Sequence, residues 1–258
     1  REVMMMNFTL SNQVQIPAVG IGTFMMTPDQ AEQAVVDALA CGYRMIDTAQ
    51  AYMNERAVGR GIKRSGVARE DIFISTKIWA SQYLTEGTVE KSLELLGTDY
   101  IDLMFIHQPA GDFMAGYRKL ETVAIRPMVN QIEMHPYFAQ ESALKVMEEY
   151  QIVPEAWAPL GGGRHNPFDN EMVKEIAAAH GKTVGQVVLR WNVQRGVVVI
   201  PKSVHKARIE ENFQIWDFTL TEEEMQKISS LDLGYQGTAV KHFDPEFVKM
   251  CNIRKIHE

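Results

Sequence analysis

The chain has 258 residues, of which 46% are hydrophobic and 23% are charged. This length supports one large hydrophobic core, and we expect a single domain over residues 1–258. The formal net charge of −7 gives no general attraction to nucleic acid or to anionic lipid. Two cysteines are too few for a disulfide framework, and no apolar run approaches the roughly 20 residues of a membrane span. We therefore expect a cytoplasmic protein whose partners are neither nucleic acids nor membranes.

Short β-branched runs alternate with stretches of helical periodicity after a predicted hairpin at residues 7–17. The first predicted helix, 27–42, begins with a capping box of Thr27 and Gln30 and ends at Gly42. Further helices are predicted near 54–65, 85–96, 112–121 and 140–150, with a pair near 170–195. Strands are predicted at 18–23, 44–48, 71–77, 102–107, 127–133, 153–158 and 197–201. Such alternation is typical of parallel strands joined by crossover helices, which is an α/β fold.

Polar side chains end several of these predicted strands. Asp47, Lys77 and His107 end three successive strands, Gln131 and Glu133 end the next one, and Lys202 and Ser203 follow the last one. Because the carboxyl ends of parallel strands meet on one face, we expect these groups to converge there. A single strand often ends in a polar residue simply because it leaves the core at that point. Three in succession indicate a functional site.

Tyr52 follows Asp47 by five residues, on a loop from which it can approach Lys77. If Asp47 holds the ammonium of Lys77 beside Tyr52, the positive charge lowers the pKa of the phenol from about 10 toward neutrality. Tyr52 is then a usable proton donor, and a neutral His107 can orient a substrate carbonyl. Acid catalysis alone does not reduce a carbonyl, so this chemistry also requires an electron source.

Seven motifs occur in order along the chain: GIGTF, IDTAQAYMNE, STKIW, DLMFIHQP, VNQIEMHP, EAWAPLG and VVVIPKSVHKARIEEN. As a set they resemble the aldo-keto reductase family, particularly the bacterial 2,5-diketo-gluconate reductase-like and prostaglandin F synthase-like members. The resemblance covers nearly the whole chain and implies a (β/α)8 TIM barrel with an N-terminal β-hairpin. It also implies a monomer that reduces a small aldehyde or ketone with NADPH, which binds without a GxGxxG motif.

The resemblance assigns roles to individual residues. It implies a catalytic set of Asp47, Tyr52, Lys77 and His107, with Tyr52 as the proton donor, and it places Trp79 in the substrate pocket. Apart from the resemblance, we expect no metal site, because Glu133 and His135 have no HxH pair elsewhere in the sequence to complete one. The implied cofactor-binding residues are Gly22, Thr23, Gln131, Trp157, Leu160, Gly161, Lys202, Ser203, Arg208, Glu211 and Asn212. The two cations and the hydroxyl of this set suit the dianionic 2′-phosphate that distinguishes NADPH from NADH.

The chain departs from the family pattern in one place. About thirty expected residues, including the fifth strand of the barrel, are absent near residues 120–126. Either this segment exists in the protein and was left out of the numbered sequence because it was disordered, or the protein truly lacks it. We expect the first, because a barrel without one strand has two edges with unpaired backbone groups.

Two other functions stay open at this point. A non-catalytic regulatory barrel would bind the nicotinamide cofactor without turnover, although the intact catalytic set argues against it. A Schiff-base lyase would use Lys77 as its nucleophile, would be trapped by borohydride, and would need no nicotinamide. The identity of the substrate depends on loops and on residues 234–258, so the sequence does not name it.

Overall fold

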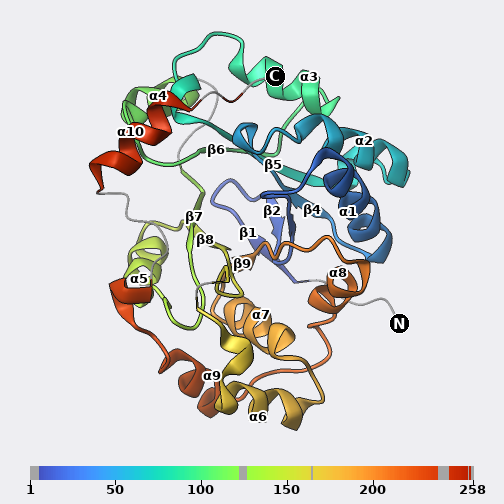
Figure 1. Ribbon diagram of the computed structural model, residues 1–258, viewed down its shortest axis with the longest axis vertical. Helices are drawn as coiled ribbons and strands as arrows, with labels where there is room; N and C mark the ends of the chain where they lie inside the picture. Colours follow the sequence, from blue (N-terminus) through green and yellow to red (C-terminus); the bar gives the residue numbers. More distant parts are fainter. Residues whose placement is uncertain (1–5, 122–126, 164, 238–243, 255, 257–258) are drawn as a thin grey trace. The chain divides into compact units, whose positions relative to one another are not determined.

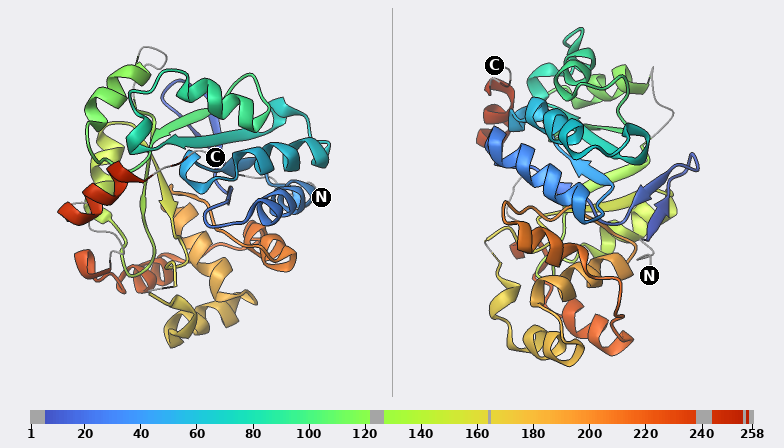
Figure 2. Two further views of the ribbon diagram at one scale, coloured as in Figure 1. Left: turned by 45° about the horizontal axis from the view of Figure 1, so that its top comes forward. Right: turned by 90° about the vertical axis from the view of Figure 1, so that its right-hand side faces the viewer.

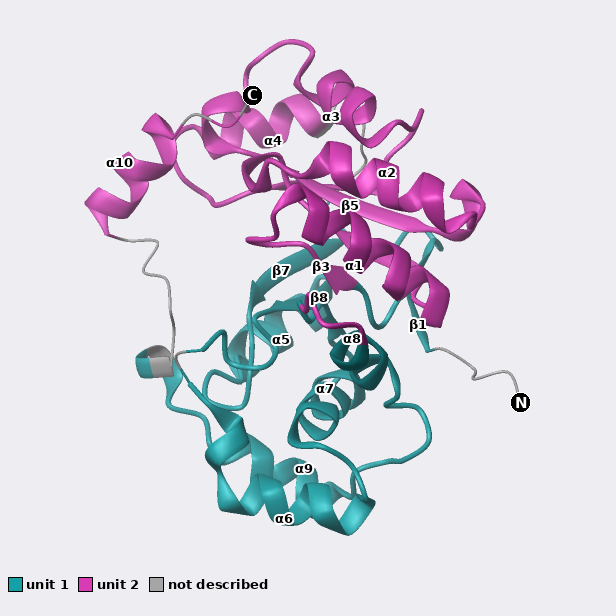
Figure 3. Ribbon diagram, turned by 45° about the vertical axis from the view of Figure 1, so that its right-hand side comes forward, with its two compact units in different colours: residues 1–20, 127–202, 207–239 teal, residues 21–126, 203–206, 240–258 magenta. Residues whose placement is uncertain are grey.

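A computed structural model describes residues 6–121, 127–163, 165–237, 244–254 and 256 (Figure 1). The chain divides into two compact units, which are coloured separately in Figure 3. The first unit comprises residues 1–20, 127–202 and 207–239, and the second comprises residues 21–126, 203–206 and 240–258. The single domain expected from the sequence stays a prediction.

The first unit contains the predicted N-terminal hairpin and a parallel sheet. Strands β1 (Asn7–Thr9) and β2 (Gln15–Pro17) pair antiparallel. The parallel sheet has the order β7-β8-β9. Its strands are β7 (Val129–Glu133), β8 (Val153–Trp157) and β9 (Val198–Val199). The main helices are α5 (Glu141–Glu149), α6 (Glu171–His180), α7 (Val184–Gln194), α8 (Lys206–Phe213) and α9 (Glu222–Ser229).

A hydrophobic cluster in the first unit packs α6, α7 and α9 together. Trp191 of α7 is fully buried, and Val173 and Ile176 of α6 and Ile228 of α9 belong to the same cluster. The indole nitrogen of Trp191 donates a hydrogen bond to the hydroxyl of Ser229, 3.1 Å away. This bond satisfies the one polar atom of the buried ring, as burial of a tryptophan requires.

The second unit contains a four-stranded parallel sheet of order β3-β4-β5-β6. Its strands are β3 (Ile21–Gly22), β4 (Met45–Asp47), β5 (Phe73–Ile78) and β6 (Leu103–Ile106). Its helices are α1 (Pro28–Cys41), α2 (Glu55–Ser65), α3 (Thr88–Leu96), α4 (Phe113–Glu121) and α10 (Pro245–Ile253). Figures 1 and 2 show α1 and α2 side by side. All six residues of β5 are buried, as expected for a central parallel strand.

Short 3-10 helices connect these elements. They lie at Gln50–Tyr52, Arg69–Asp71, Ala80–Gln82, Pro167–Asp169 and Gly234–Gly237. No helix in the described ranges is long and apolar enough to cross a bilayer.

The start of α1 agrees with its sequence signals in detail. The Thr27 hydroxyl accepts from the backbone nitrogen of Gln30, and the Gln30 side chain accepts in return from the backbone nitrogen of Thr27. Gly42 ends the helix with a φ of 115°. These contacts confirm the predicted capping box and helix end, because they occupy backbone groups that the helix leaves unpaired.

The predicted strand at 18–23 is shorter in the structure. Only Ile21 and Gly22 form β3, whereas Val19 makes an isolated parallel bridge with Val199 inside the first unit. The described residues supply seven strands of parallel sheet in total. The expected gap falls largely on residues 122–126, which lie outside the described residues.

Candidate active site

The second unit brings three predicted catalytic residues to one face of its sheet. Asp47 pairs in register with Ser75, and Lys77 pairs with Phe105. The backbone nitrogen of His107 donates to the carbonyl oxygen of Ile78, so the ladder continues one residue past β6. Because side chains alternate between faces along a strand, Asp47, Lys77 and His107 share one face. These three strand-end residues therefore converge within this unit, and the expected convergence of the other strand-end residues with them stays a prediction.

Asp47 and Lys77 form a buried ion pair. The Nζ of Lys77 lies 2.5 Å from Oδ2 of Asp47, and both side chains are at most 3% exposed. Lys77 also donates to the carbonyl oxygen of Thr48 at 2.9 Å, while Ser75 donates to Oδ1 of Asp47 at 2.8 Å. Buried charges are stable only when their remaining hydrogen-bonding groups are also satisfied. These four residues meet that condition and fix the position of the ammonium group.

Tyr52 lies against this ammonium group. The Nζ of Lys77 is 5.1 Å from the centroid of the Tyr52 ring. The ring of His107 meets Tyr52 edge to face, with 5.7 Å between centroids. Phe24 packs on Tyr52 at 5.2 Å. The structure thus places Tyr52, Lys77, Asp47 and His107 together, as the sequence predicts.

His107 is held in its neutral form. Burial lowers its pKa well below 6.5, and the positive charges of Lys77 and Arg254 lower it further. The Nδ1 atom of His107 is buried and has no hydrogen-bond partner in the part of the chain that the structure describes. Trp79 packs edge to face on the imidazole at 4.9 Å between centroids. A neutral imidazole beside Tyr52 can hydrogen-bond a polar substrate group without adding a charge.

Asn54 was not predicted from the sequence, although it holds the loop that carries Tyr52. It is 2% exposed, and its Nδ2 donates to the carbonyl oxygens of Thr23 and Met26 at 2.9 and 3.2 Å. Its Oδ1 accepts from the hydroxyl of Thr48 at 3.0 Å. Asn54 thereby ties the loop after β4 to the loop after β3. The only sequence signal was a polar residue two positions after Tyr52, which has no periodicity to mark it as buried.

Gly22 and Thr23, which the resemblance assigns to the cofactor, also belong to the second unit. Gly22 is buried in β3 in register with Asp47. The backbone nitrogen and the hydroxyl of Thr23 both donate to the carbonyl oxygen of Asp47, at 3.0 and 3.1 Å. Thr23 is therefore a structural neighbour of the Asp47–Lys77 pair.

Gln131 and Trp157 share one face of the sheet in the first unit. Gln131 pairs in register with Glu155, and Glu133 pairs with Trp157. The amide of Gln131 donates to the carboxylate of Glu155 at 2.6 Å, and Glu155 is fully buried. Trp157 is partly exposed. Its indole remains accessible in part, as a ring that stacks on a ligand requires.

The loop after β8 contains Leu160 and Gly161. Gly161 has a φ of +87°, and Gly162 and Gly163 that follow it also have positive φ. A Cβ atom at Gly161 would lie 1.8 Å from the carbonyl oxygen of His165. Position 161 therefore admits only glycine without a backbone shift. Gly161 itself is buried, whereas Gly162 and Gly163 are exposed.

The remaining predicted cofactor residues lie near α8. Lys202 and Arg208, both of the first unit, are exposed, and neither makes an ion pair with the described residues. Glu211 accepts from the hydroxyl of Thr183 at 2.8 Å, and Asn212 is 6% exposed. Ser203 is grouped with the second unit, where its hydroxyl accepts from the backbone nitrogen of His205 at 3.1 Å.

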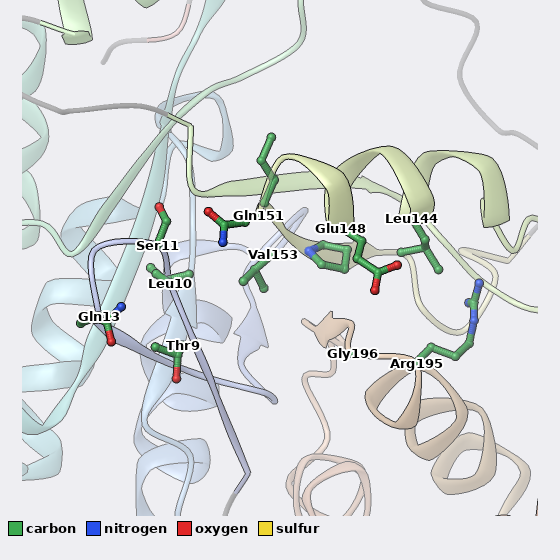
Figure 4. A pocket seen from close by; sticks show the side chains of 12 residues that line it. Thr9, Leu10, Ser11, Gln13, Leu144, Glu148, Gln151, Val153, Arg195 and Gly196 are labelled. Atoms are coloured by element: carbon green, nitrogen blue, oxygen red, sulfur yellow. The ribbon is translucent and has the colours of Figure 1, made fainter.

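A separate groove of about 550 Å³ lies within the first unit (Figure 4). It is lined by the hairpin turn, by α5 with the start of β8, and by the end of α7, and Leu10, Glu148 and Arg195 represent these three parts. None of the predicted site residues lines it. The groove is therefore a different surface from the candidate active site.

Comparison with known proteins identifies the family. The aldo/keto reductase family model matches residues 18–123 and 114–233. The chain is 42% identical to a 9,11-endoperoxide prostaglandin H2 reductase of Trypanosoma cruzi (strain CL Brener), over 87% of this chain and 90% of that protein. It is 41% identical to a glyoxal reductase of Bacillus subtilis (strain 168), over 86% and 91%. An aldo-keto reductase of Bombyx mori, solved in complex with NADP, superposes with a TM-score of 0.84 at 29% identity, over 95% and 97%.

The comparisons also bear on the missing segment. The alignment with the Trypanosoma protein is 257 positions long but uses 87% of the 258 residues here, which is about 224 residues. About thirty positions of that relative therefore have no counterpart in this chain. The family model likewise matches in two pieces, which overlap at residues 114–123, and this overlap reaches into the region of the expected gap.

The predicted fold class is confirmed, since the solved structures that this chain matches are aldo/keto reductases and the described strands form parallel α/β sheets with an N-terminal hairpin. The chain belongs to the aldo/keto reductase family, whose members are oxidoreductases with a (β/α)8 barrel fold.

Proposed function

We propose that this protein reduces small aldehydes or ketones to alcohols with NADPH, and that Tyr52 is the proton donor. The observation that carries the proposal is the buried Asp47–Lys77 pair, whose ammonium group lies against the Tyr52 ring. A positive charge at this position favours the phenolate and so assists release of the Tyr52 proton.

The residues of the first unit fit a nicotinamide cofactor. Trp157 is partly exposed, Gly162 and Gly163 offer exposed backbone beside the buried Gly161, and Lys202 and Arg208 offer cations without ion-pair partners among the described residues. We propose that Trp157 and Gln131 hold the nicotinamide end, with Gly22 and Thr23 near the ribose. Leu160 and Gly161 would bind the pyrophosphate, and Lys202, Ser203 and Arg208 the 2′-phosphate. Glu211 and Asn212 would then lie near the adenine. NADPH supplies a hydride when it is bound.

The protein's own groups then perform the remaining chemistry. His107 donates a hydrogen bond that orients the substrate oxygen, and Tyr52 transfers its proton to that oxygen as the carbonyl carbon is reduced. Lys77 stabilises the resulting phenolate, while Asp47 keeps Lys77 in place. Trp79, which is 3% exposed, forms an apolar wall of the substrate pocket beside His107 and excludes water.

NADPH consumption with glyoxal or another small aldehyde tests this function, since one relative is named as a glyoxal reductase. We expect one alcohol formed for each NADPH consumed. Binding of NADPH without any consumption, over a panel of small aldehydes and ketones, would support a non-catalytic binding protein instead. The cytoplasmic location and the monomeric state stay predictions from the sequence.

Replacement of Asn54 by alanine tests the loop that carries Tyr52. The variant loses four hydrogen-bonding contacts to Thr23, Met26 and Thr48. Because catalysis is sensitive to displacements of about 1 Å, we expect kcat to fall by about tenfold to 100-fold with KM little changed. Asn12→Ala, in the exposed turn of the hairpin, is the matched control. A kcat equal to that of the wild type would show that Asn54 does not position Tyr52.

Replacement of Arg208 by alanine tests the phosphate contact. Charge-assisted hydrogen bonds to a phosphate are strong, so we expect NADPH affinity to fall by about tenfold or more while NADH affinity stays nearly constant. Fluorescence titration with both cofactors measures the two dissociation constants. Lys145→Ala, which removes another exposed cation of the first unit, should change neither. Equal losses for both cofactors would remove Arg208 from the 2′-phosphate site.

A further inference from the structure

Glu55 is a buried carboxylate that the proposed reaction does not use. It is the first residue of α2, three positions after Tyr52, and it is 3% exposed. The hydroxyl of Thr76 donates to its Oε1 at 2.7 Å, and the hydroxyl of Ser92 in α3 donates to its Oε2 at 3.4 Å. Both partners are fully buried, and Glu55 makes no ion pair with residues in the described ranges. Two neutral donors are therefore the side chains that stabilise its negative charge.

The surroundings of Glu55 oppose each other in their effect on its charge. Burial raises the pKa of Glu55, while the hydroxyls of Thr76 and Ser92 and the positive charge of Lys77 lower it in part. Because the net shift is upward, Glu55 changes its charge closer to neutral pH than an exposed glutamate does. Thr76 directly precedes Lys77 in β5, which brings the carboxylate near the ammonium. The interaction is reciprocal, so a charge on Glu55 also acts on the surroundings of Lys77.

A pocket of about 150 Å³ in the second unit borders Glu55. Its lining includes Gln50 and Met53, on either side of Tyr52 in the chain, and the cations Arg56 and Lys91. The side chains of Arg56 and Lys91 are 53% and 43% exposed, so the pocket is open to solvent beside them. Water in the pocket can take up or return the proton of Glu55 without a movement of the fold.

Other charged groups face this region from neighbouring elements. Arg56 and Lys91 pair with Glu94 of α3, at 3.7 and 2.8 Å. Arg254, which follows α10, donates to the carbonyl oxygen of Ala51 at 3.3 Å. Surface arginines and lysines stay charged near neutral pH, and the hydrogen bond from Lys91 lowers the pKa of Glu94 further from neutrality. The charge of these groups is therefore constant where that of Glu55 changes.

Lys77 connects Glu55 with the proposed proton donor. Its Nζ lies 5.1 Å from the centroid of the Tyr52 ring. An ionised Glu55 opposes the positive field that favours the Tyr52 phenolate, whereas a protonated Glu55 leaves that field unopposed. We propose that Glu55 controls proton donation by Tyr52 through Lys77, so that reduction is faster when Glu55 is protonated and slower when it is ionised. This inference rests on the proposed carbonyl reduction, and it adds a regulation by pH to the same site.

The pH profile of the reduction step tests the proposal in the full chain. Single-turnover oxidation of NADPH with glyoxal measures this step apart from product release. As pH rises, we expect the wild-type rate to fall by about threefold to tenfold to a plateau, because an ionised Glu55 weakens acid catalysis without abolishing it. The complete loss that follows when Tyr52 itself is deprotonated is a separate step at higher pH.

Glu55→Gln keeps the size of the side chain and an acceptor for Thr76, but it cannot ionise. We expect the partial step to disappear, so that the rate stays at the low-pH level of the wild type until Tyr52 is deprotonated. Thr76→Val removes a donor that favours the ionised carboxylate, so the partial step should move to higher pH. Glu90→Gln, which changes an exposed carboxylate of α3, is the matched control and should keep the wild-type profile.

Three results would overturn the proposal with carbonyl reduction intact. A wild-type profile without a partial step is the first. The second is a partial step that persists in Glu55→Gln or, if that variant does not fold, stays at the wild-type pH in Thr76→Val. The third is an equal loss of rate at every pH in Glu55→Gln, which would mean that Glu55 only supports the fold around Tyr52. Failure to oxidise NADPH at any pH would instead remove the proposed function itself.

Discussion

Tyr52→Phe is expected to lower turnover of every carbonyl substrate by about 100-fold to 10,000-fold, the range that a general acid contributes. The substitution removes only the phenolic hydroxyl, so the ring can keep its packing against Phe24 and His107. NADPH affinity and the thermal midpoint should therefore stay close to those of the wild type. Steady-state kinetics with glyoxal, a cofactor titration and thermal denaturation measure these three quantities.

Tyr150→Phe provides the control, because Tyr150 is 62% exposed and lies outside the proposed site. It should leave turnover unchanged. Turnover near the wild-type rate in Tyr52→Phe would mean that another group donates the proton. The Lys77 ammonium beside Tyr52 would then have no role in proton transfer.

Lys77→Met is expected to damage both turnover and stability. The substitution leaves Asp47 buried without its ion-pair partner, and breaking such a pair costs about 3–5 kcal/mol. Turnover should fall as well, because no positive charge remains to stabilise the Tyr52 phenolate. Urea denaturation gives the free energy of unfolding, and kinetics at a temperature where the variant is folded give the turnover.

The double variant Asp47→Asn with Lys77→Met separates these two effects. Its stability should recover part of the loss, since no uncompensated charge stays buried, whereas its turnover should remain low. If Lys77→Met alone has wild-type stability, the pair is not buried as described. If it has wild-type turnover, the ammonium has no role in proton transfer.

The convergence of Asp47, Lys77 and His107, which we propose to be catalytic, could be predicted because each strand-end signal is local. Asp47, Lys77 and His107 each end an apolar run, and the rule that parallel strands share a carboxyl edge predicts that they meet. The N-terminus of α1 was equally predictable, since Thr27, Pro28 and Gln30 act within one helical turn. In the helix the physical cause lies within a few residues of its effect, whereas in the sheet a general rule of parallel strands brings together residues that are thirty positions apart.

The supporting contacts could not be predicted, because they join residues that are distant in the sequence. Asn54 reaches Thr23 and Met26 across about thirty residues, and Trp79 bonds to Cys251 across 172. No periodicity marks a polar side chain as buried or selects a carbonyl on a remote helix. The position of Arg254 depends on the packing of α10, for which the sequence made no specific prediction.

Transfer of deuterium from C4 of labelled NADPH to the carbonyl carbon of a small aldehyde tests the central claim most directly. With stereospecifically labelled cofactor and glyoxal, we predict that one of the two labelled forms transfers its deuterium to the product alcohol, as mass spectrometry of the product would show. Wild-type protein should transfer the label, and Tyr52→Phe should transfer it at least about 100-fold more slowly. An alcohol product without deuterium from either labelled form, or no alcohol at all while NADPH stays bound, would contradict the account.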